Sequence, residues 1–261
     1  MVNSPYAVSK NGNIKYLDAV KVKSVIELNE NFSRISPLFN PEIMARKTAV
    51  IIGTGAGGRL LAEYLVRCGV TNFFLVDPDI VSKTNIATQA VYTKEIGKKK
   101  VKALKKAIKR INPKANVKAL SKPLDNNFTD EEFEALIDLD LLERPTDVLI
   151  CACTDSFPAQ ARAAALAMKY GTPFLASQEY AGGEGGEIYF SYPGVTNSSC
   201  PRCALSSRYE AYKAGYRNEV TSDGAPFFAA ARIASTAAQI ATMLLMYHED
   251  SDCRYGTMLD K

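Results

Sequence analysis

The chain has 261 residues, of which 47% are hydrophobic, and a formal net charge of +4. This length and apolar content are enough for one large α/β domain, or such a domain with an appendage, and argue against a disordered chain. The small net charge does not indicate a general nucleic-acid binder. The six cysteines are too few and too scattered for a disulfide scaffold.

Neither end of the chain predicts a membrane or secretory role. The N-terminus, from Met1 to Tyr6, lacks a basic segment followed by an apolar core, so no secretory signal is expected. The most hydrophobic late segment, residues 233 to 247, falls short of the roughly 20 apolar residues that span a bilayer. We therefore expect a cytoplasmic protein without membrane contacts.

Residues 1 to 47 are predicted to be an N-terminal extension, with a helix near residues 24 to 32 and a second helix capped by Asn40 and begun by Pro41. From residue 48 onward, strand-like and helical patterns alternate. This predicts a Rossmann-like, doubly wound and mostly parallel sheet with helices on both faces. The strand-like runs are 48 to 53, 72 to 77, 116 to 120, 147 to 153 and 173 to 176, and the helical patterns are 56 to 68, 95 to 111, 129 to 142 and 158 to 170.

The pattern changes beyond residue 173. A glycine-rich turn from Gly182 to Gly186 leads into residues 187 to 191, which predicts antiparallel strands that extend the sheet. A polar stretch, residues 204 to 223, then precedes an alanine-rich helix from about 225 to 247. Residues 255 to 260 read as a last strand.

A glycine-rich loop follows the first strand-like run of the alternating region. Gly53, Gly55 and Gly58 let the backbone turn tightly and approach a phosphate, which the free N–H groups of the next helix can bind. Asp77 ends the second strand about 24 residues after Gly53, where a carboxylate accepts hydrogen bonds from ribose hydroxyls. Together these features predict a site for an adenosine nucleotide.

Later residues narrow the nucleotide to ATP, because their order resembles the ThiF/MoeB and ubiquitin-activating (HesA-type) family of adenylyltransferases. The resemblance covers roughly residues 30 to 261 and implies a nucleotide-binding adenylation domain over 48 to 261. The residues that carry it are Asp77, Asp79, Asn85, Gln89, Gly97, Lys100, Asn112, Pro113, Thr154, Asp155, Gly186, Cys200 and Cys203.

The resemblance implies a role for each polar residue. Asp77 and Asp79 belong to the nucleotide site, with Asp77 on the ribose, while Asn85, Gln89 and Lys100 contact the phosphates. Asp155 serves adenylate formation together with Mg²⁺. Fixed cations and Mg²⁺ suit this reaction, because negative charge spreads toward pyrophosphate when a carboxylate attacks the α-phosphate.

Little proton transfer is needed, so a chain whose single histidine is His248 can still be such an enzyme. A hydrolase with a Ser-His-Asp or Cys-His centre is not expected.

The sequence departs from the family's pattern at one phosphate-binding position. Thr88 stands where an arginine is usual, and Arg59, after the glycine loop, is a candidate replacement. A second arginine of the family acts from the partner subunit, and Arg34 is the best match to it. The resemblance therefore implies a homodimer with Arg34 at the partner's site.

Three further segments complete the prediction. Cys200 and Cys203 have the spacing of half a zinc site, which Cys253 and another ligand would have to complete. Residues 204 to 223 match a crossover loop over the incoming peptide tail, and no cysteine between 204 and 252 is placed to form a thioester. The lysines from 98 to 109 and Arg110 occupy several helical faces, which favours a solvated surface over nucleic-acid binding.

We therefore predict ATP-dependent adenylation of the terminal carboxylate of a small ubiquitin-like or sulfur-carrier protein, or of a peptide. Three alternatives stay open. One is a dehydratase similar to those acting on threonylcarbamoyladenosine in tRNA, with the lysine-rich helix on RNA. Another is a non-catalytic half of an activating heterodimer. The last is an NAD-dependent oxidoreductase, in which Tyr209 and Lys213 match a Tyr-x-x-x-Lys pattern.

Overall fold

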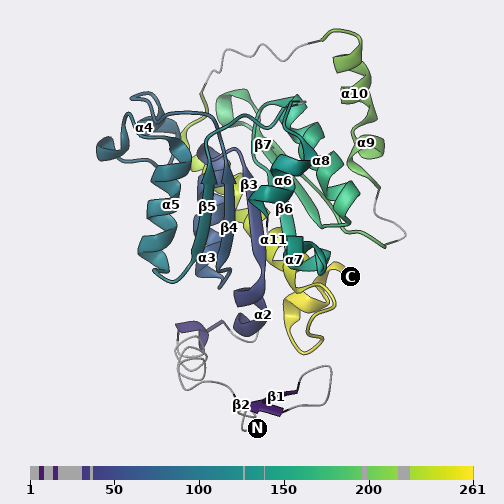
Figure 1. Ribbon diagram of the computed structural model, residues 1–261. Helices are drawn as coiled ribbons and strands as arrows, with labels where there is room; N and C mark the ends of the chain where they lie inside the picture. Colours follow the sequence, from purple (N-terminus) through teal and green to yellow (C-terminus); the bar gives the residue numbers. More distant parts are fainter. Residues whose placement is uncertain are drawn as a thin grey trace.

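The computed structural model describes residues 6–8, 14–16, 31–35, 38–125, 127–137, 139–195, 199–216 and 224–260. Near the N-terminus, strands β1 (Tyr6–Val8) and β2 (Ile14–Tyr16) pair antiparallel to each other. Between residues 38 and 260, the described chain forms helices packed around a single six-stranded sheet (Figure 1).

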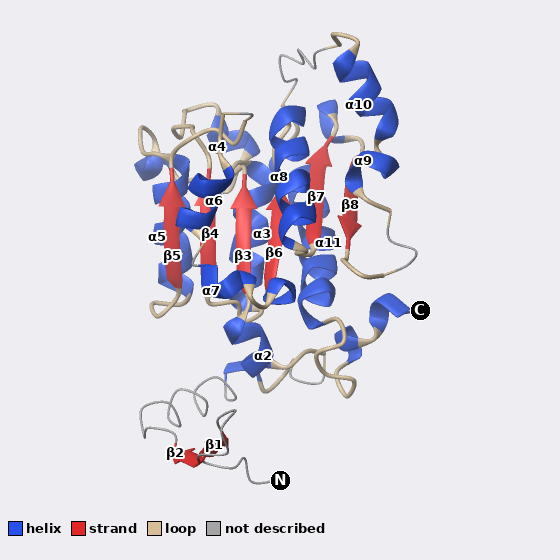
Figure 2. Ribbon diagram, turned by 45° about the vertical axis from the view of Figure 1, so that its right-hand side comes forward, coloured by secondary structure: helices blue, strands red, loops and turns tan. Residues whose placement is uncertain are grey.

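The sheet has the strand order β5-β4-β3-β6-β7-β8 (Figure 2). The first five strands in this order run parallel to one another. The last strand, β8, runs antiparallel to β7. This confirms the predicted doubly wound sheet with its antiparallel extension. The strands are β3 (Thr48–Ile52), β4 (Asn72–Val76), β5 (Asn116–Leu120), β6 (Val148–Ala152), β7 (Phe174–Glu179) and β8 (Gly186–Ser191).

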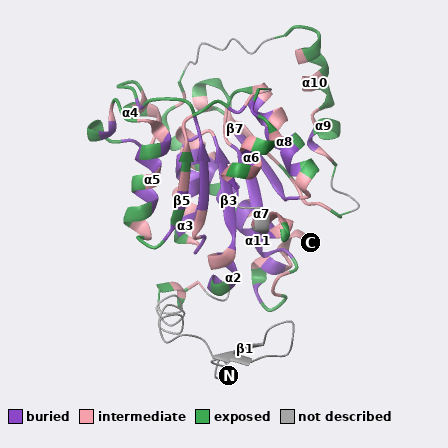
Figure 3. Ribbon diagram, viewed as in Figure 1, coloured by how far each residue is buried: buried purple, intermediate pink, exposed green. Residues whose placement is uncertain are grey.

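The central strands are apolar at successive positions because both of their faces are buried (Figure 3). In β3, Ala49 and Ile51 belong to one hydrophobic cluster, while Val50 and Ile52 belong to the other. The helices on the Ile51 face are α3 (Ala56–Arg67), α5 (Lys100–Ile111) and α11 (Phe227–Met246), and those on the Val50 face include α6 (Asp130–Leu136) and α8 (Phe157–Tyr170).

Helix α11 lies within the predicted range of about 225 to 247. Its length and composition alone would let it cross a membrane, but 56% of its most apolar stretch is buried inside the domain. It packs there against α3 and β7. This burial is typical of a core helix, which passes the same test of length and composition.

The remaining described elements are short. Helix α2 begins as predicted, because Asn40 Oδ1 accepts a hydrogen bond from Glu42 N (3.0 Å) and Pro41 is the first helical residue. Most of the helix expected near 24 to 32 lies outside the described residues. The other elements are α2 (Pro41–Arg46), α4 (Asn85–Thr88), α7 (Leu139–Leu142), α9 (Pro201–Ala204), α10 (Ser206–Lys213), η1 (Thr93–Glu95), η2 (Pro145–Asp147), η3 (Ala181–Gly183), η4 (Arg254–Gly256) and η5 (Met258–Asp260).

Two predicted helices are wrong in extent. Helix α5 starts at Lys100 rather than at residue 95, because Glu95 ends a 3₁₀ turn and Gly97 has a φ of +82°. The helix expected over 129 to 142 is interrupted after Leu136. There Ile137 adopts an extended conformation and buries its side chain in the core.

The predicted last strand at 255 to 260 is also wrong. This segment forms η4 and η5 instead, and Tyr255 N donates to Leu38 O (2.9 Å). Its apolar side chains, Tyr255 and Leu259, pack against the α11 face of the core rather than joining the sheet.

Candidate active site

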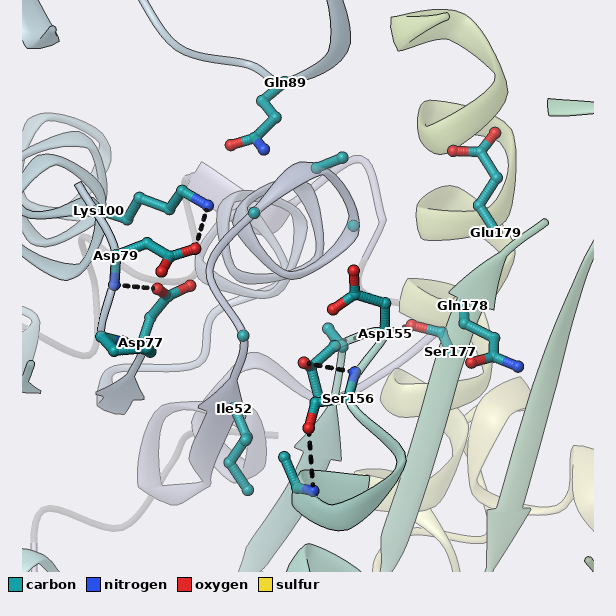
Figure 4. A pocket seen from close by; sticks show the side chains of 18 of the residues that line it. Ile52, Asp77, Asp79, Gln89, Lys100, Asp155, Ser156, Ser177, Gln178 and Glu179 are labelled. Carbon is teal, nitrogen blue, oxygen red and sulfur yellow. Dashed lines mark hydrogen bonds and ion pairs between the residues drawn. The ribbon is translucent and has the colours of Figure 1, made fainter. Parts of the chain in front are cut away.

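A pocket of about 970 Å³ lies at the carboxyl ends of the parallel strands. The strand order reverses there, since β4 and β5 lie beyond β3 while β7 and β8 lie beyond β6. Parallel α/β sheets bind ligands at such switch points. Figure 4 shows side chains from the loops after β3, β4 and β6 and from the end of β7 around the pocket.

The glycine loop depends on close backbone contacts. Gly53 has a φ of +83°, and a Cβ atom on it would lie 2.4 Å from the Cys153 carbonyl oxygen. A Cβ on Gly58 would lie 1.9 Å from the Gly53 carbonyl oxygen. Gly53 and Gly55 line the pocket, whereas Gly58 packs α3 against the loop and lies outside the lining. The structure therefore gives Gly58 a packing role, and its predicted nucleotide contact stays a prediction.

Asp77, at the end of β4, holds this loop in place. Its Oδ2 accepts hydrogen bonds from Thr54 N (2.6 Å) and Thr54 Oγ1 (3.1 Å), and its Oδ1 accepts one from Asp79 N (2.8 Å). Each carboxylate oxygen has two acceptor sites, so Asp77 can still accept a hydrogen bond from a ligand hydroxyl.

Lys100 and Asp79 form an ion pair at the pocket, with 2.9 Å between Nζ and Oδ2. Lys100 is the first residue of α5, and its backbone N–H donates to Asp79 O (2.9 Å). Figure 4 shows both side chains on the same side of the pocket as Asp77. The ammonium is thus held beside the glycine loop by a carboxylate that an anionic ligand can replace.

Helix α4 brings three predicted residues to the pocket: Asn85, Thr88 and, just after it, Gln89. Gln89 lies over Gly55, and its Oε1 is buried without a hydrogen-bond donor among the described residues. The Thr88 methyl group lies 3.2 Å from the Cβ position of Gly224. The segment that leads into α11 therefore lies against the position where the family's pattern has arginine.

Asp155 is exposed on the loop after β6, and no side chain of the described chain pairs with it. Figure 4 shows it between the glycine loop and the end of β7. The preceding carbonyl, Thr154 O, accepts a hydrogen bond from Gln160 Nε2 (2.5 Å) on α8. Gln160 Nε2 also donates to Gln178 Oε1 (2.9 Å), so the Asp155 loop is tied to β7.

Sequence reasoning missed the β7 side of the pocket, formed by Ser177, Gln178 and Glu179. Gln178 Nε2 donates to Glu187 Oε1 (2.7 Å) on β8. Glu187 in turn forms an ion pair with Arg208 of α10. The only sign of this side of the pocket in the sequence was the polar end of the strand. The residues of α8, β8 and α10 that bond to it are distant in sequence and are brought together only by the fold.

The segment that matches a crossover loop includes a helix, α10, which is anchored to the domain. Besides the Arg208–Glu187 pair, Tyr209 and Tyr212 of α10 pack on Phe157, with ring centroids 4.9 and 5.2 Å apart. Neither Tyr209 nor Lys213 lines the pocket. This placement gives the Tyr-x-x-x-Lys pattern of an oxidoreductase no access to a nucleotide there.

Two arginines considered from the sequence lie outside the lining of the pocket. Arg59 is buried, and its guanidinium pairs with Glu95 (3.0 Å) and Glu63 (3.2 Å), so it does not replace the arginine missing at Thr88. Arg34 is exposed, next to residues that contact the C-terminal end of α3, away from the glycine loop. A role at a partner's pocket stays a prediction.

The donor groups fit Mg²⁺ better than zinc. Mg²⁺ is commonly held by one or two carboxylates together with substrate phosphates, and Asp155 offers such a carboxylate. Cys200 and Cys203 lie with their Sγ atoms 3.1 Å apart, but the described residues contain no cluster of three or more metal-binding side chains. Cys253 is buried in the core beside Asp250. Within the described part of the chain, the cysteine pair therefore has no further ligands of the kind that a zinc site needs.

The thiol that lines the pocket is not suited to nucleophilic attack. Burial raises the pKa of Cys153 to about 11, although a hydrogen bond from Ser177 acts against this. A thiol with such a pKa remains protonated near neutral pH, and the thiolate is the reactive form.

The geometry agrees with comparisons to known proteins. A model of the ThiF family matches residues 31–254, and the chain belongs to this family. It is 26% identical to ubiquitin-like modifier-activating enzyme 5 of Bombyx mori over 202 residues, which are 75% of this chain and 51% of that protein. It is 35% identical to the tRNA threonylcarbamoyladenosine dehydratase of Bacillus subtilis over 101 residues, 38% of each chain.

The chain spans about half the length, or less, of the curated relatives it matches. Among solved structures, E. coli MccB with AMPCPP and MccA superimposes with a TM-score of 0.63 at 16% identity, covering 78% of this chain and 57% of that one. PaaA superimposes with a TM-score of 0.60 at 19% identity, covering 91% and 78%. These likenesses establish a shared fold.

Proposed function

We propose that the protein adenylates a carboxylate at the expense of ATP. In this reaction a carboxylate oxygen of the substrate forms a bond to the α-phosphorus, and the bond to the departing pyrophosphate breaks. The observation that carries the proposal is that one pocket joins the glycine loop, Asp77, Lys100 and Asp155, with which no described side chain pairs. Membership of the ThiF family and likeness to activating enzymes support it.

The pocket residues at successive strand ends of the sheet bind different parts of the nucleotide. Asp77 accepts hydrogen bonds from the ribose, and the N–H groups at the start of α3 bind phosphate. Lys100 exchanges Asp79 for phosphate oxygens, and its charge stabilises the pyrophosphate as negative charge moves onto it. Asp155 would hold Mg²⁺, which neutralises phosphate charge when bound. Gln89, above Gly55, can turn its amide toward the same phosphates.

The substrate we propose is the carboxyl terminus of a small ubiquitin-like or sulfur-carrier protein, or of a peptide. The names of the relatives that act on ubiquitin-like modifiers support this, as does the structure of MccB with MccA. Because the Cys153 thiol stays protonated, we propose that the acyl-adenylate is released or passed on without forming a thioester to this thiol.

ATP–pyrophosphate exchange tests this proposal. We expect exchange with a carrier or peptide that ends in a free glycine carboxylate, and none with the same peptide amidated at its C-terminus. Absence of exchange with every carboxylate, together with tight NAD binding, would favour an oxidoreductase. Absence of exchange with preserved ATP binding would identify a non-catalytic partner subunit, as the threonine at position 88 allows.

A second candidate is adenylation of a carboxylate carried by tRNA. The similarity to the Bacillus subtilis dehydratase supports it. Helix α5 supports it as well. Its buried residues occupy one side, so the lysines after Lys100 lie on the opposite, solvent-facing side, whereas the sequence suggested that they occupy several faces. Lys102, Lys106 and Lys109 are exposed there without ion pairs to described residues. Stimulation of ATP turnover by tRNA, lost when these three lysines become serine, is the expected result for this candidate.

A further inference from the structure

The pocket is longer than the nucleotide site just described, because it continues to the end of β7. Neighbouring strands lie about 4.8 Å apart, so the ends of β4 and β7, three spacings apart in the order β4-β3-β6-β7, are about 14 Å from each other. A nucleotide with its ribose at Asp77 and its phosphates at the glycine loop leaves the β7 end to the acyl substrate. An acyl subsite at this end rests on the proposed adenylation.

Glu179 is the last residue of β7 and lies at this end of the pocket. Ala152 and Ala176 are the last pair in the register of β6 and β7, and beyond them β6 leads into the loop that carries Asp155, which also lines the pocket. Alternate residues of a strand share a face, so Glu179 lies on the face of Ser177 rather than that of Gln178. Figure 4 shows Glu179 and Asp155 on one side of the pocket, apart from the Asp79–Lys100 pair.

One oxygen of the Glu179 carboxylate has no hydrogen-bond donor in the described part of the chain. This oxygen, Oε1, is buried. Burial raises the pKa of Glu179, and Arg232 on α11 acts against this from beyond ion-pair distance. Arg232 directs its Nη2 to Gly183 O (3.1 Å) instead. A buried acceptor without a donor is costly, and such groups normally find one in a ligand or in water.

The other polar groups near Glu179 are already bonded or are acceptors themselves. The Gln178 amide is used on both sides, by Gln160 and by Glu187. Asp155 adds a second carboxylate, with which no described side chain pairs. The acyl end of the pocket is therefore acidic and short of donors, so it suits a ligand group that donates hydrogen bonds and carries positive charge.

We propose that Glu179 binds a cationic side chain within the last two residues of the acyl substrate, so that the enzyme selects a basic carboxyl-terminal tail. Charge complementarity favours an ammonium or guanidinium group over a neutral amide. A hydrogen bond between charged partners contributes about 1.5–3 kcal/mol, which corresponds to a preference of roughly tenfold to a hundredfold. A glutamate at the same position of the substrate would be disfavoured.

The test is ATP–pyrophosphate exchange with the full chain and tetrapeptides that differ only in one of their last two residues. That residue is lysine, the uncharged norleucine of similar length, or glutamate. We expect kcat/KM to favour lysine over norleucine at least about tenfold at one of the two positions, and Glu179→Gln to reduce this preference to less than about threefold. Glu184→Gln is the matched control, because Glu184 is exposed on the adjacent turn and lies outside the pocket lining.

Three results would overturn the inference. The wild-type enzyme could treat lysine and norleucine alike, or Glu179→Gln could keep the wild-type preference. A uniform loss of exchange with every peptide in Glu179→Gln would instead show that Glu179 only positions Arg232 and the turn at Gly183. Exchange without a charge preference would contradict only the role proposed for Glu179. No exchange with any peptide would contradict the proposed peptide substrate as well.

Discussion

At the scale of single residues, the glycines of the loop have two different roles, lining the pocket and packing α3 against the loop, which the glycine motif in the sequence does not distinguish. Gly55 faces the pocket, whereas Gly58 brings α3 against the Gly53 carbonyl. The sequence predicted the loop because its glycines follow an apolar strand and precede an amphipathic helix. It could not tell which glycine meets a ligand, because that depends on how closely β3, α3 and the Cys153 carbonyl approach.

Gly58→Ala should destabilise the protein by about 1–3 kcal/mol, because overpacking forces the backbone to shift. The new Cβ would meet the Gly53 carbonyl oxygen at 1.9 Å. Gly57→Ala is the control, since a Cβ there meets nothing within 4 Å and alanine favours a helix. Chemical denaturation measures both. Equal stability of the two variants would contradict the packing role.

Other residues of the site show where sequence reasoning ends. Asp77 and Asp155 were found because each follows a buried strand at a spacing typical of the family. Glu179 and Gln160 were not, since their partners are distant in sequence and are brought close only by the fold. Arg59 was misjudged, because nothing in the sequence shows that Glu95 folds back to bury it.

At the scale of elements, strands were predicted better than the helices that cross over the site. Strands β3, β4 and β6 are apolar runs buried on both faces, a pattern that is visible in the sequence. Helix α10 has no buried residues, so its sequence carries no amphipathic signal. Contacts with Phe157 and Glu187 hold it instead.

We predict that Arg208→Met loosens α10 without unfolding the domain. Amide hydrogen exchange over residues 205 to 214 should rise several-fold, because the variant removes the link to Glu187, while the melting temperature changes little. Lys213→Met, at an exposed position of the same helix, should leave exchange unchanged. Unaltered exchange in Arg208→Met would show that the aromatic contacts alone hold α10.

The same link should depend on pH. Burial opposes ionisation of Glu187, but hydrogen bonds from Arg208 and Tyr180 outweigh it and lower the pKa of this carboxyl below its ordinary 4.5. A lowered pKa adds stability that is present above the ordinary value and is lost as the pH falls through the folded-state value. Protection of α10 should therefore persist near pH 5 and decline below about 4.5 in the wild type.

At the scale of the whole molecule, the end of the domain opposite the pocket is fastened by a buried ion cluster. The Lys47 side chain is fully buried, and its Nζ contacts Asp147 (2.5 Å) and Glu249 (2.7 Å). Asp147 lies just before β6 and Glu249 just after α11, so one lysine joins three distant parts of the chain. Nothing local in the sequence marks it.

Lys47→Met should destabilise the protein by about 3 kcal/mol, the lower end of the range for breaking a buried ion pair, because it removes the fully buried cation while Arg46 still pairs with both carboxylates. Thermal or chemical denaturation measures this change. Lys106→Met, on the exposed side of α5, should be close to neutral. A small effect of Lys47→Met would mean that Arg46 and Arg144, which also contact Asp147, compensate for the loss.

The proposed homodimer makes its own prediction. If Arg34 acts at the partner's pocket, Arg34→Ala should lose most of the exchange activity, and mixing it with an Asp155→Ala subunit should restore part of it. In the mixed dimer, one pocket has both an intact Asp155 and an intact partner arginine. Arg254→Ala is the control, as another exposed arginine outside the pocket lining. A monomer in solution, or no recovery on mixing, would contradict the role of Arg34.

The most direct test of the central claim is ATP–pyrophosphate exchange in Asp155→Asn. The Asp155 side chain is exposed and forms no hydrogen bond or ion pair with described side chains, so the substitution should leave stability and ATP binding nearly unchanged. Loss of the charge at the reacting phosphate should lower exchange by at least about a hundredfold. Exchange at the wild-type rate in Asp155→Asn would contradict the assignment of this pocket as an adenylation site.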